Sequence, residues 1–302
     1  MKNTIQYTQC PACESKDISE VLCAKDYTVS GEIFEIWQCA HCNLRFTQNV
    51  PDEEGIVPYY KADTYISHSN TRKGIVNWLY HIVRKRTLKQ KAELVKKYSG
   101  LQTGNLLDIG AGTGAFASVM KSENWEVLAL EPDEDARRNA KRDFDIELQD
   151  GGELFSLDEA SFDVITMWHV LEHVHDLHNY IAVFQKIIKS KGTLLIAVPN
   201  YTSFDATYYE GFWAAYDVPR HLYHFSPESM KLLVAQYGFK VEKCLPMKFD
   251  SYYVSMLSEQ YKNGKKNLIK SFLNGFQSNK KAQHNAEKYS SVIYVIKKQK
   301  IV

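Results

Sequence analysis

The stretch Leu106–Gly114, LLDIGAGTG, decides the fold, because it joins a short apolar run to a glycine-rich turn. The apolar run is typical of a strand buried in a parallel sheet. Gly110, Gly112 and Gly114 let the backbone approach a ligand closely. Residues 115–120, AFASVM, then begin a helix whose amide groups point toward that ligand. The stretch therefore predicts a strand, a turn and a helix that together hold a nucleotide-like molecule.

Two carboxylates near this turn discriminate between cofactors. Glu131 closes a second apolar strand, VLALE, 21 residues after Gly110, where it can accept hydrogen bonds from the two hydroxyls of a ribose. The spacing of Gly110, Gly112 and Ala115 also satisfies the dinucleotide pattern, so a NAD-type oxidoreductase is one interpretation. Asp108 would repel a pyrophosphate but could hold the ammonium group of an amino-acid cofactor. This favours S-adenosylmethionine (SAM).

On these residues the chain resembles the class I SAM-dependent methyltransferases over about residues 101–249 and the terminal strand. The resemblance implies a Rossmann-like α/β fold, a seven-stranded doubly wound sheet whose last strand inserts antiparallel beside the fifth. It also implies that Asp108 and the three glycines bind the methionine part of SAM, and that Glu131 binds the ribose. Asp150 is expected near the adenine amino group, with Glu153 as a rival.

Four histidines are candidates for removing a proton from the acceptor, because their usual pKa lies near neutrality. The resemblance places His169, Glu172 and His173 of HVLEHV near the sulfonium, so His169 is also expected to contact the cofactor. His221 and His224 lie in PRHLYHFS, which resembles a segment after the fifth strand in a subgroup of bacterial methyltransferases. The alternative is that these histidines only bind loop carbonyls.

The HVLEHV segment has a second interpretation as a metal site. In the related ubiquinone-pathway O-methyltransferases the same stretch reads E-x-x-E-H and binds a divalent metal. Here His169 replaces the first carboxylate, which disfavours magnesium. His169, Glu172 and His173 either hold another metal or shape the cofactor pocket.

Four of the six cysteines form two C-x-x-C knuckles separated by 25 residues: Cys10, Cys13, Cys39 and Cys42. This spacing predicts a zinc ribbon over residues 1–50, and a closed set of four thiolates indicates a structural metal. An iron centre, a redox pair and a metal-free ribbon are the alternatives. Cys23 and Cys244 are expected to be buried small hydrophobes. The ribbon lacks a basic cluster, which disfavours nucleic-acid binding.

The remaining organisation follows from composition and periodicity. The chain has 302 residues, is 44% hydrophobic and carries a net charge of +1. It has no apolar run near the roughly 20 residues of a membrane span, and it lacks a signal sequence, so we expect a cytoplasmic protein. A linker and a basic amphipathic helix, about Thr71 to Tyr98, occupy residues 51–100. The methyltransferase domain fills residues 101–302, with an aromatic acceptor-side loop at 200–225 and a basic helical insertion at 251–288.

These observations predict a SAM-dependent methyltransferase acting on a small-molecule, sugar-linked or lipid-linked acceptor. The basic helices either present a solvated charged face or contact a membrane surface or an anionic substrate. A non-catalytic cofactor-binding scaffold that recruits a partner through the ribbon is the remaining alternative. Neither the acceptor, the methylated atom nor the oligomeric state follows from the sequence.

Overall fold

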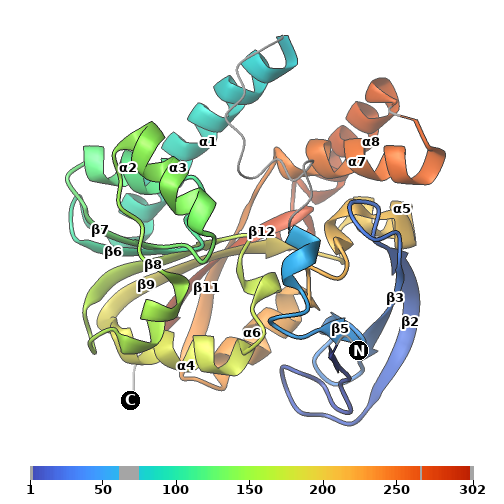
Figure 1. Ribbon diagram of the computed structural model, residues 1–302, viewed down its shortest axis with the longest axis horizontal. Coiled ribbons are helices and arrows are strands. Elements are labelled where there is room, and N and C mark those ends of the chain that lie inside the picture. The colour runs from blue at the N-terminus through green and yellow to red at the C-terminus, as the bar shows by residue number, and fades with distance from the viewer. Residues whose placement is uncertain (1–2, 61–74, 266, 300–302) are drawn as a thin grey trace. The chain divides into compact units, whose positions relative to one another are not determined.

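The computed structural model describes residues 3–60, 75–265 and 267–299 (Figure 1). The chain divides into two compact units. In described residues, the first contains 3–60, 169–181, 196–265 and 267–294, and the second contains 75–168, 182–195 and 295–299. Among the described residues, no helix is long and apolar enough to cross a membrane.

The second unit contains the strand, turn and helix predicted from LLDIGAGTG. Its elements are α1 (Ile75–Ser99), β6 (Asn105–Ile109), α2 (Ala115–Ser122), β7 (Glu126–Leu130), α3 (Glu134–Phe144), η3 (Gly151–Ser156), β8 (Phe162–Trp168) and most of α4 (Leu177–Ile187). β6 pairs in parallel with both β7 and β8, as expected for a doubly wound sheet. The helix predicted from Thr71 begins at Ile75 in the described residues, and residues 71–74 lie outside them.

The large sheet has six strands in the order β11-β12-β9-β8-β6-β7. The three strands not yet introduced are β9 (Ile188–Pro199), β11 (Phe239–Pro246) and β12 (Ser291–Lys298). The amide of Asn200, after the end of β9, donates to the carbonyl of Ser290 before β12 begins. Lys298 at the end of β12 donates to the carbonyl of Ile188 at the start of β9. The last strand therefore lies antiparallel beside β9, as predicted.

The predicted count of seven strands was wrong by one in the described residues. Residues 145–149 contribute only a single parallel bridge, in which Gln149 pairs with Leu130. Asp145 ends α3 with a φ of 51°, so too few residues remain to extend the pairing. Ile146 and Leu148 still point inward and pack against the small side chain of Ala140. The alternating apolar residues Ile146 and Leu148 are therefore buried although they do not form a strand.

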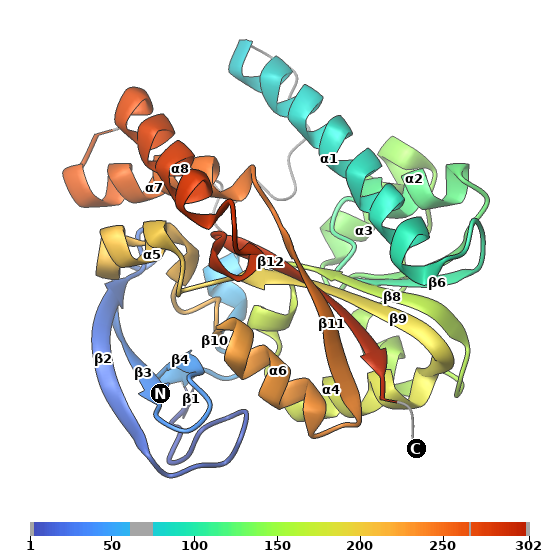
Figure 2. The ribbon, with the colours of Figure 1, turned by 180° about the vertical axis from the view of Figure 1, so that it is seen from behind.

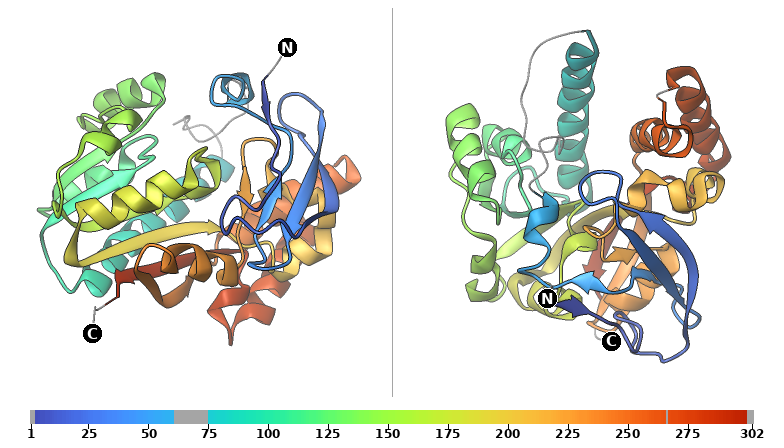
Figure 3. Two further views of the ribbon diagram at one scale, coloured as in Figure 1. Left: turned by 90° about the horizontal axis from the view of Figure 1, so that it is seen from below. Right: turned by 45° about the vertical axis from the view of Figure 1, so that its right-hand side comes forward.

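The first unit contains the N-terminal strands and most of the C-terminal segment. Its four-stranded sheet has the order β10-β4-β3-β2. These strands are β2 (Ile18–Lys25), β3 (Ile33–Cys39), β4 (Arg45–Thr47) and β10 (Tyr223–His224). Figure 3 shows β2 and β3 as a long antiparallel pair, and the register joins Ile18 to Cys39. A short segment distant in sequence, β10, thereby completes the N-terminal sheet.

The first unit also contains two short strands and several helices. They are β1 (Thr4–Ile5), β5 (Val50–Pro51), η1 (Val57–Tyr60), η4 (Leu171–His173), α5 (Phe204–Tyr209), η5 (Glu210–Phe212), η6 (Ala214–Tyr216), α6 (Pro227–Ala235), α7 (Asp250–Asn263), α8 (Leu268–Ala282) and η7 (Ala286–Lys288). α6 begins with a reciprocal capping box formed by Ser226 and Ser229.

The aromatic residues expected to line an acceptor site mostly form the core of the first unit. Tyr201, Tyr209, Trp213 and Tyr216 are buried in one hydrophobic cluster. Their hydroxyl and indole groups are satisfied inside the protein; for example, Trp213 donates to Asp205 Oδ2 at 2.9 Å. These four residues therefore belong to the packed core of the first unit.

Candidate active site and metal centre

Asp108 lies at the centre of the candidate cofactor site in the second unit. Its side chain is 2% exposed, and Oδ1 accepts a hydrogen bond from Thr166 Oγ1 at 2.7 Å. Burial raises the pKa of this carboxyl to about 7, although the Thr166 hydroxyl and the charge of Lys91 act in the opposite direction. A buried carboxylate with one neutral donor is suited to receive a cation.

The glycine turn has the backbone that the sequence predicts. Gly110, Gly112 and Gly114 all have positive φ angles, of 67°, 54° and 72°. A Cβ at Gly114 would lie 2.9 Å from the Cβ of Ala140, whereas a Cβ at Gly112 would meet no atom within 4 Å. Gly114 is therefore required for packing α2 against α3, and Gly112 lies at an open position of the turn.

Glu131 is linked directly to this turn. It is 6% exposed, and Oε2 accepts a hydrogen bond from the Gly112 amide at 2.7 Å. Its other oxygen accepts from the Asp133 amide at 3.0 Å. These bonds fix the carboxylate at the end of β7, beside the glycine loop. The two predicted carboxylates and the three glycines thus come together in one unit.

Asp150 lies at the beginning of η3, directly after the bridging residue Gln149. Its Oδ1 accepts from the Gly152 amide at 3.0 Å, and its Oδ2 lies 2.8 Å from Arg137 Nη1. The side chain remains 59% exposed. Glu153, the rival, lies within the first turn of the same short helix.

Three side-chain contacts in the second unit were missed by the sequence analysis. Thr166 binds Asp108, and the Lys91 ammonium lies 4.4 Å from the ring centre of Trp168. Phe116 packs edge-to-face on the same indole. Thr166 could have been found from the sequence, because a parallel neighbour of β6 places it opposite Asp108. Lys91 had no such signal, since it lies on a helix whose packing the sequence does not determine.

The candidate histidines lie in the first unit and have different environments. His169 follows β8 directly, with a φ of 60°. Its Nε2 lies 2.9 Å from Asp250 Oδ2, and its Nδ1 lies 3.3 Å from Glu172 Oε1. Although burial acts to lower it, the bonds to these carboxylates raise the pKa of His169 to about 10. His169 is therefore a cation at neutral pH.

His173 and His221 form a pair of adjacent imidazoles. Their rings lie 4.5 Å apart between centres. His173 Nδ1 lies 3.0 Å from the Arg220 carbonyl, and His221 Nδ1 lies 2.9 Å from the Ala215 carbonyl. A carbonyl only accepts, so both Nδ1 atoms carry a proton, and Nε2 is the position that holds the lone pair in a neutral ring. Burial, reinforced by the neighbouring His221, lowers the pKa of His173 to about 4.

Glu172 completes this histidine pair. One oxygen of Glu172 and one nitrogen each of His173 and His221 lie within 4.8 Å of one another. Within the described part of the chain, Glu172 Oε2 is buried and accepts no hydrogen bond. The structure therefore combines Glu172 and His173 with His221, and it pairs His169 with Asp250. This arrangement can accept a proton or hold a divalent cation.

His224 does not belong to the cluster of Glu172, His173 and His221, because its Nε2 is bonded to a threonine of the N-terminal sheet. It lies in β10 opposite Arg45, and its Nε2 is 3.0 Å from Thr47 Oγ1. Burial first, and the neighbouring His221, lower its pKa well below the usual value. His224 therefore joins the N-terminal sheet to the C-terminal segment.

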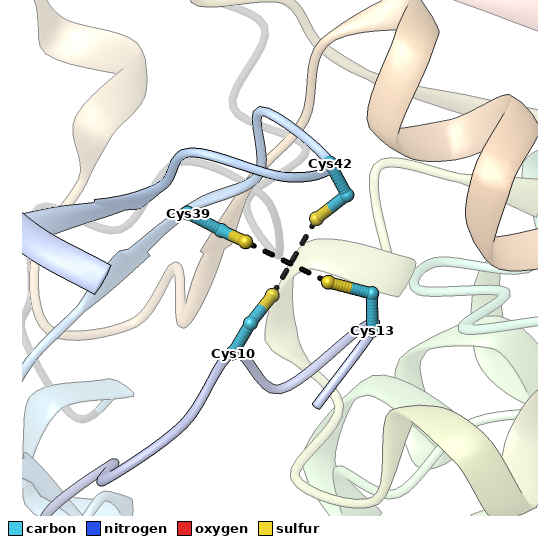
Figure 4. A group of neighbouring side chains, drawn as sticks. All are labelled: Cys10, Cys13, Cys39 and Cys42. Atoms are coloured by element: carbon cyan, nitrogen blue, oxygen red, sulfur yellow. Dashed lines mark hydrogen bonds between the residues drawn. The ribbon is translucent and has the colours of Figure 1, made fainter. Parts of the chain in front are cut away.

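The four knuckle cysteines converge on one point, as Figure 4 shows. Cys10 Sγ lies 3.5 Å from Cys42 Sγ, and Cys13 Sγ lies 3.6 Å from Cys39 Sγ. The bond from Cys42 lowers the pKa of Cys10 to about 5, whereas burial raises that of Cys13 to about 11.

The other two cysteines lie outside this cluster, and the expectation that both are buried was wrong. Cys23 is exposed and Cys244 is only partly covered. Cys23 lies on a strand facing solvent, where its Sγ contacts Glu20. Cys244 contacts Glu287.

The chain is similar in fold to a solved methyltransferase structure. A structure from Galdieria sulphuraria, assigned as a sarcosine dimethylglycine methyltransferase, is 14% identical and has a TM-score of 0.50. The alignment covers 71% of this chain and 86% of that one. A SAM-dependent methyltransferase from Archaeoglobus fulgidus is 19% identical over 73% of this chain and 100% of its own, with a TM-score of 0.47.

A Haemonchus contortus phosphoethanolamine N-methyltransferase 2, solved with SAM, is 16% identical over 70% of this chain and 53% of its own, with a TM-score of 0.47. At these identities the likeness concerns the fold. No curated protein sequence matches the chain. The sequence model of the methyltransferase domain family matches residues 81–243, more than half of the 302 residues. The chain therefore belongs to the SAM-dependent methyltransferases, with a Rossmann-like fold.

Proposed function

We propose that Asp108 and the glycine turn bind the methionine part of SAM, that Glu131 binds the ribose hydroxyls, and that Asp150 lies near the adenine. The observation that carries this assignment is the buried Asp108 carboxylate, which has a single neutral donor beside a turn of positive-φ glycines. An ammonium group there would replace the hydration that burial removes from the carboxylate. A NAD pyrophosphate would meet the same carboxylate with the wrong charge.

Calorimetry with S-adenosylhomocysteine (SAH) and with NAD tests this assignment. Binding of SAH and not NAD is expected, and Glu131→Gln should weaken SAH binding by about tenfold or more, since a charged acceptor is lost. Glu153→Gln is the matched control, because it neutralises the rival carboxylate. Full SAH affinity in Glu131→Gln, or a preference for NAD, contradicts the assignment.

We further propose that His173 and His221 are the groups that accept a proton from the acceptor. Each Nδ1 donates to a carbonyl, so Nε2 is the atom that would accept the proton, and the neighbouring Glu172 carboxylate would stabilise the imidazolium that forms. His169 is unsuited to this role because it is already protonated between two carboxylates. His224 is unsuited as well, because its Nε2 is hydrogen-bonded to Thr47 of the N-terminal sheet. The same cluster offers two nitrogens and one oxygen to a divalent cation of the zinc or iron type.

Methyl transfer at several pH values tests the role of this pair. His173→Asn or His221→Asn should lower kcat by about 100-fold or more, which is the usual contribution of general base catalysis. His284→Asn, at an exposed position, is the control. If both active-site variants keep the wild-type rate, the pair does not accept the proton. Elemental analysis distinguishes the metal alternative, in which His221→Asn loses a bound cation.

The four cysteines fit zinc by their geometry. A tetrahedral zinc with thiolates at about 2.3 Å places its sulfurs about 3.8 Å apart, and the observed Cys10–Cys42 and Cys13–Cys39 separations are 3.5 and 3.6 Å. All four sulfurs lie within 4.8 Å of one another. A bound zinc would stabilise the N-terminal sheet and, with every position closed, would not contact the methyl acceptor.

One equivalent of zinc by elemental analysis is expected, and it should be lost in a Cys10→Ser, Cys13→Ser double variant. Cys23→Ser, outside the cluster, should retain the metal. A wild-type protein purified without zinc, or a double variant that keeps it, overturns the proposal.

The acceptor that we propose is a small molecule, free or linked to a sugar or lipid. Incubation of the enzyme with a cell extract and methyl-labelled SAM should give a labelled low-molecular-mass product. Label appearing only in protein would contradict a small-molecule acceptor. A pure binding scaffold would produce no labelled product at all.

A further inference from the structure

Helices α7 and α8 pack side by side (Figure 2), and α8 exposes an apolar face. Its large apolar side chains face solvent, and they range from 50% exposed at Phe276 to 76% at Ile269. This outward set, here called the α8 apolar face, comprises Leu268, Ile269, Phe272, Leu273 and Phe276. Tyr253 of α7 is also 48% exposed. Five large apolar residues on two turns of one helix exceed the scattered exposure normal for a soluble protein.

The inward side of α8 carries small and polar residues instead. It is formed by Ser271, Asn274, Gly275, Ser278 and Ala282. Gly275 is required there, since a Cβ would lie within 3.0 Å of Ser251 and Tyr252 on α7. Close approach through small residues is the packing that membrane helices use when their outer surface is covered by lipid.

Hydrogen bonds hold α8 in this orientation. Ser278 donates to Asp205 Oδ1 at 2.6 Å, and Asn274 donates to the Tyr209 hydroxyl at 2.8 Å. Rotating α8 to bury its apolar face would remove these partners from buried polar groups, which is costly. The exposure of the apolar face is thus fixed by the fold.

Lysines dominate the charge around this face, although Lys270 is paired with the buried Glu259. Residues 260–286 contain six lysines and no acidic residue. Lys265 precedes α8 and Lys280 lies in its last turn, and both are exposed. Two copies of the chain joined through this face would bring lysines against lysines. An anionic bilayer complements both properties, because its headgroups attract the lysines and its acyl boundary receives the apolar side chains.

We propose that the α8 apolar face docks this enzyme on an anionic lipid bilayer, with Phe272 and Phe276 inserted at the acyl boundary and Lys265 and Lys280 at the headgroups. Docking would place the enzyme at the surface where lipid-linked molecules are found. The inference stands independently of the methyl acceptor, since it concerns vesicle binding and not turnover.

Flotation of the full chain with vesicles tests the proposal. Wild type should bind vesicles of equal parts phosphatidylglycerol and phosphatidylcholine, and should not bind phosphatidylcholine alone. The Phe272→Ser, Phe276→Ser variant should bind at least about 100-fold more weakly, since two inserted aromatic side chains are lost. Lys265→Gln with Lys280→Gln should lose about tenfold.

Matched controls separate this face from general stickiness. Phe155→Ser and Ile33→Ser remove exposed apolar side chains elsewhere, and Lys191→Gln with Lys240→Gln removes two exposed charges elsewhere. These variants should bind like wild type, and circular dichroism checks that each variant is folded. No binding by wild type, or equal loss in the controls, overturns the proposal. A wild-type dimer that the phenylalanine variant dissociates would assign the face to a second copy instead.

Discussion

Replacing Asp108 by Asn should make the protein more stable at alkaline pH while weakening its hold on the cofactor. The carboxylate is 2% exposed and its pKa is raised by burial from 3.8 to about 7. Asn has nearly the same shape, and its amide oxygen can accept the Thr166 hydrogen bond as the carboxylate does. The substitution therefore removes the buried charge and little else.

The magnitude follows from the difference in pKa. The native state binds the proton more tightly than the unfolded chain, so stability falls as the pH rises from 3.8 toward about 7. A shift of roughly 3 units corresponds to a total of about 4 kcal/mol. Of this, about 3 kcal/mol is lost above pH 5. The stability of Asp108→Asn relative to wild type should therefore increase by about 3 kcal/mol between pH 5 and pH 8.

Urea unfolding followed by tryptophan fluorescence measures this difference at each pH, with Asp158→Asn, an exposed position, as the control. Calorimetry on the same variant should show SAH binding weakened by about tenfold or more, because a charge-assisted hydrogen bond is lost. A difference in stability that does not change with pH would refute the inference that Asp108 is a buried, strained carboxylate. Unchanged SAH affinity would remove it from the cofactor site.

Two further substitutions test the packing around the site. Gly114→Ala should lower stability by about 2 kcal/mol or more, because it adds a steric clash to a positive φ, whereas Gly100→Ala, with an equally positive φ and open space, should cost only about 1 kcal/mol. Thermal melting compares the two, and equal losses would show that the clash is relieved. Arg220→Met should cost about 3–5 kcal/mol, because it leaves the buried Asp26 without its cation. Arg138→Met, at an exposed ion pair, should change stability by at most about 1 kcal/mol in the same urea titration, and comparable losses would contradict this difference.

The grouping of Asp108, the glycines and Glu131 could be predicted because these residues are close in sequence or fixed by strand order. Asp108 and the glycines lie in one strand and one turn, and Glu131 ends the neighbouring strand. The parallel sheet brings the ends of such strands to the same edge, so the spacing along the chain determines the spacing in space. The two cysteine pairs could be predicted for the same reason, since the members of each C-x-x-C pair are close in sequence.

The histidine cluster could not be predicted in the same way. The sequence grouped His169 with Glu172 and His173, since they share one turn of chain. The tertiary structure keeps the contact of His169 with Glu172, adds Asp250 from 81 residues away, and supplies His221 from the segment before β10. Such contacts depend on how loops pack, and apolar periodicity does not specify loop packing.

The sequence by itself therefore determined the family, the cofactor turn and the four-cysteine cluster, because each depends on residues within one local unit or on regular strand order. Only the tertiary structure decided which histidine is a cation, which aromatic residues are core, and which side of α8 faces solvent. Those outcomes depend on burial and on hydrogen-bond partners contributed by distant segments. In α8 the polar partners Asp205 and Tyr209 reverse the orientation that hydrophobicity alone would predict.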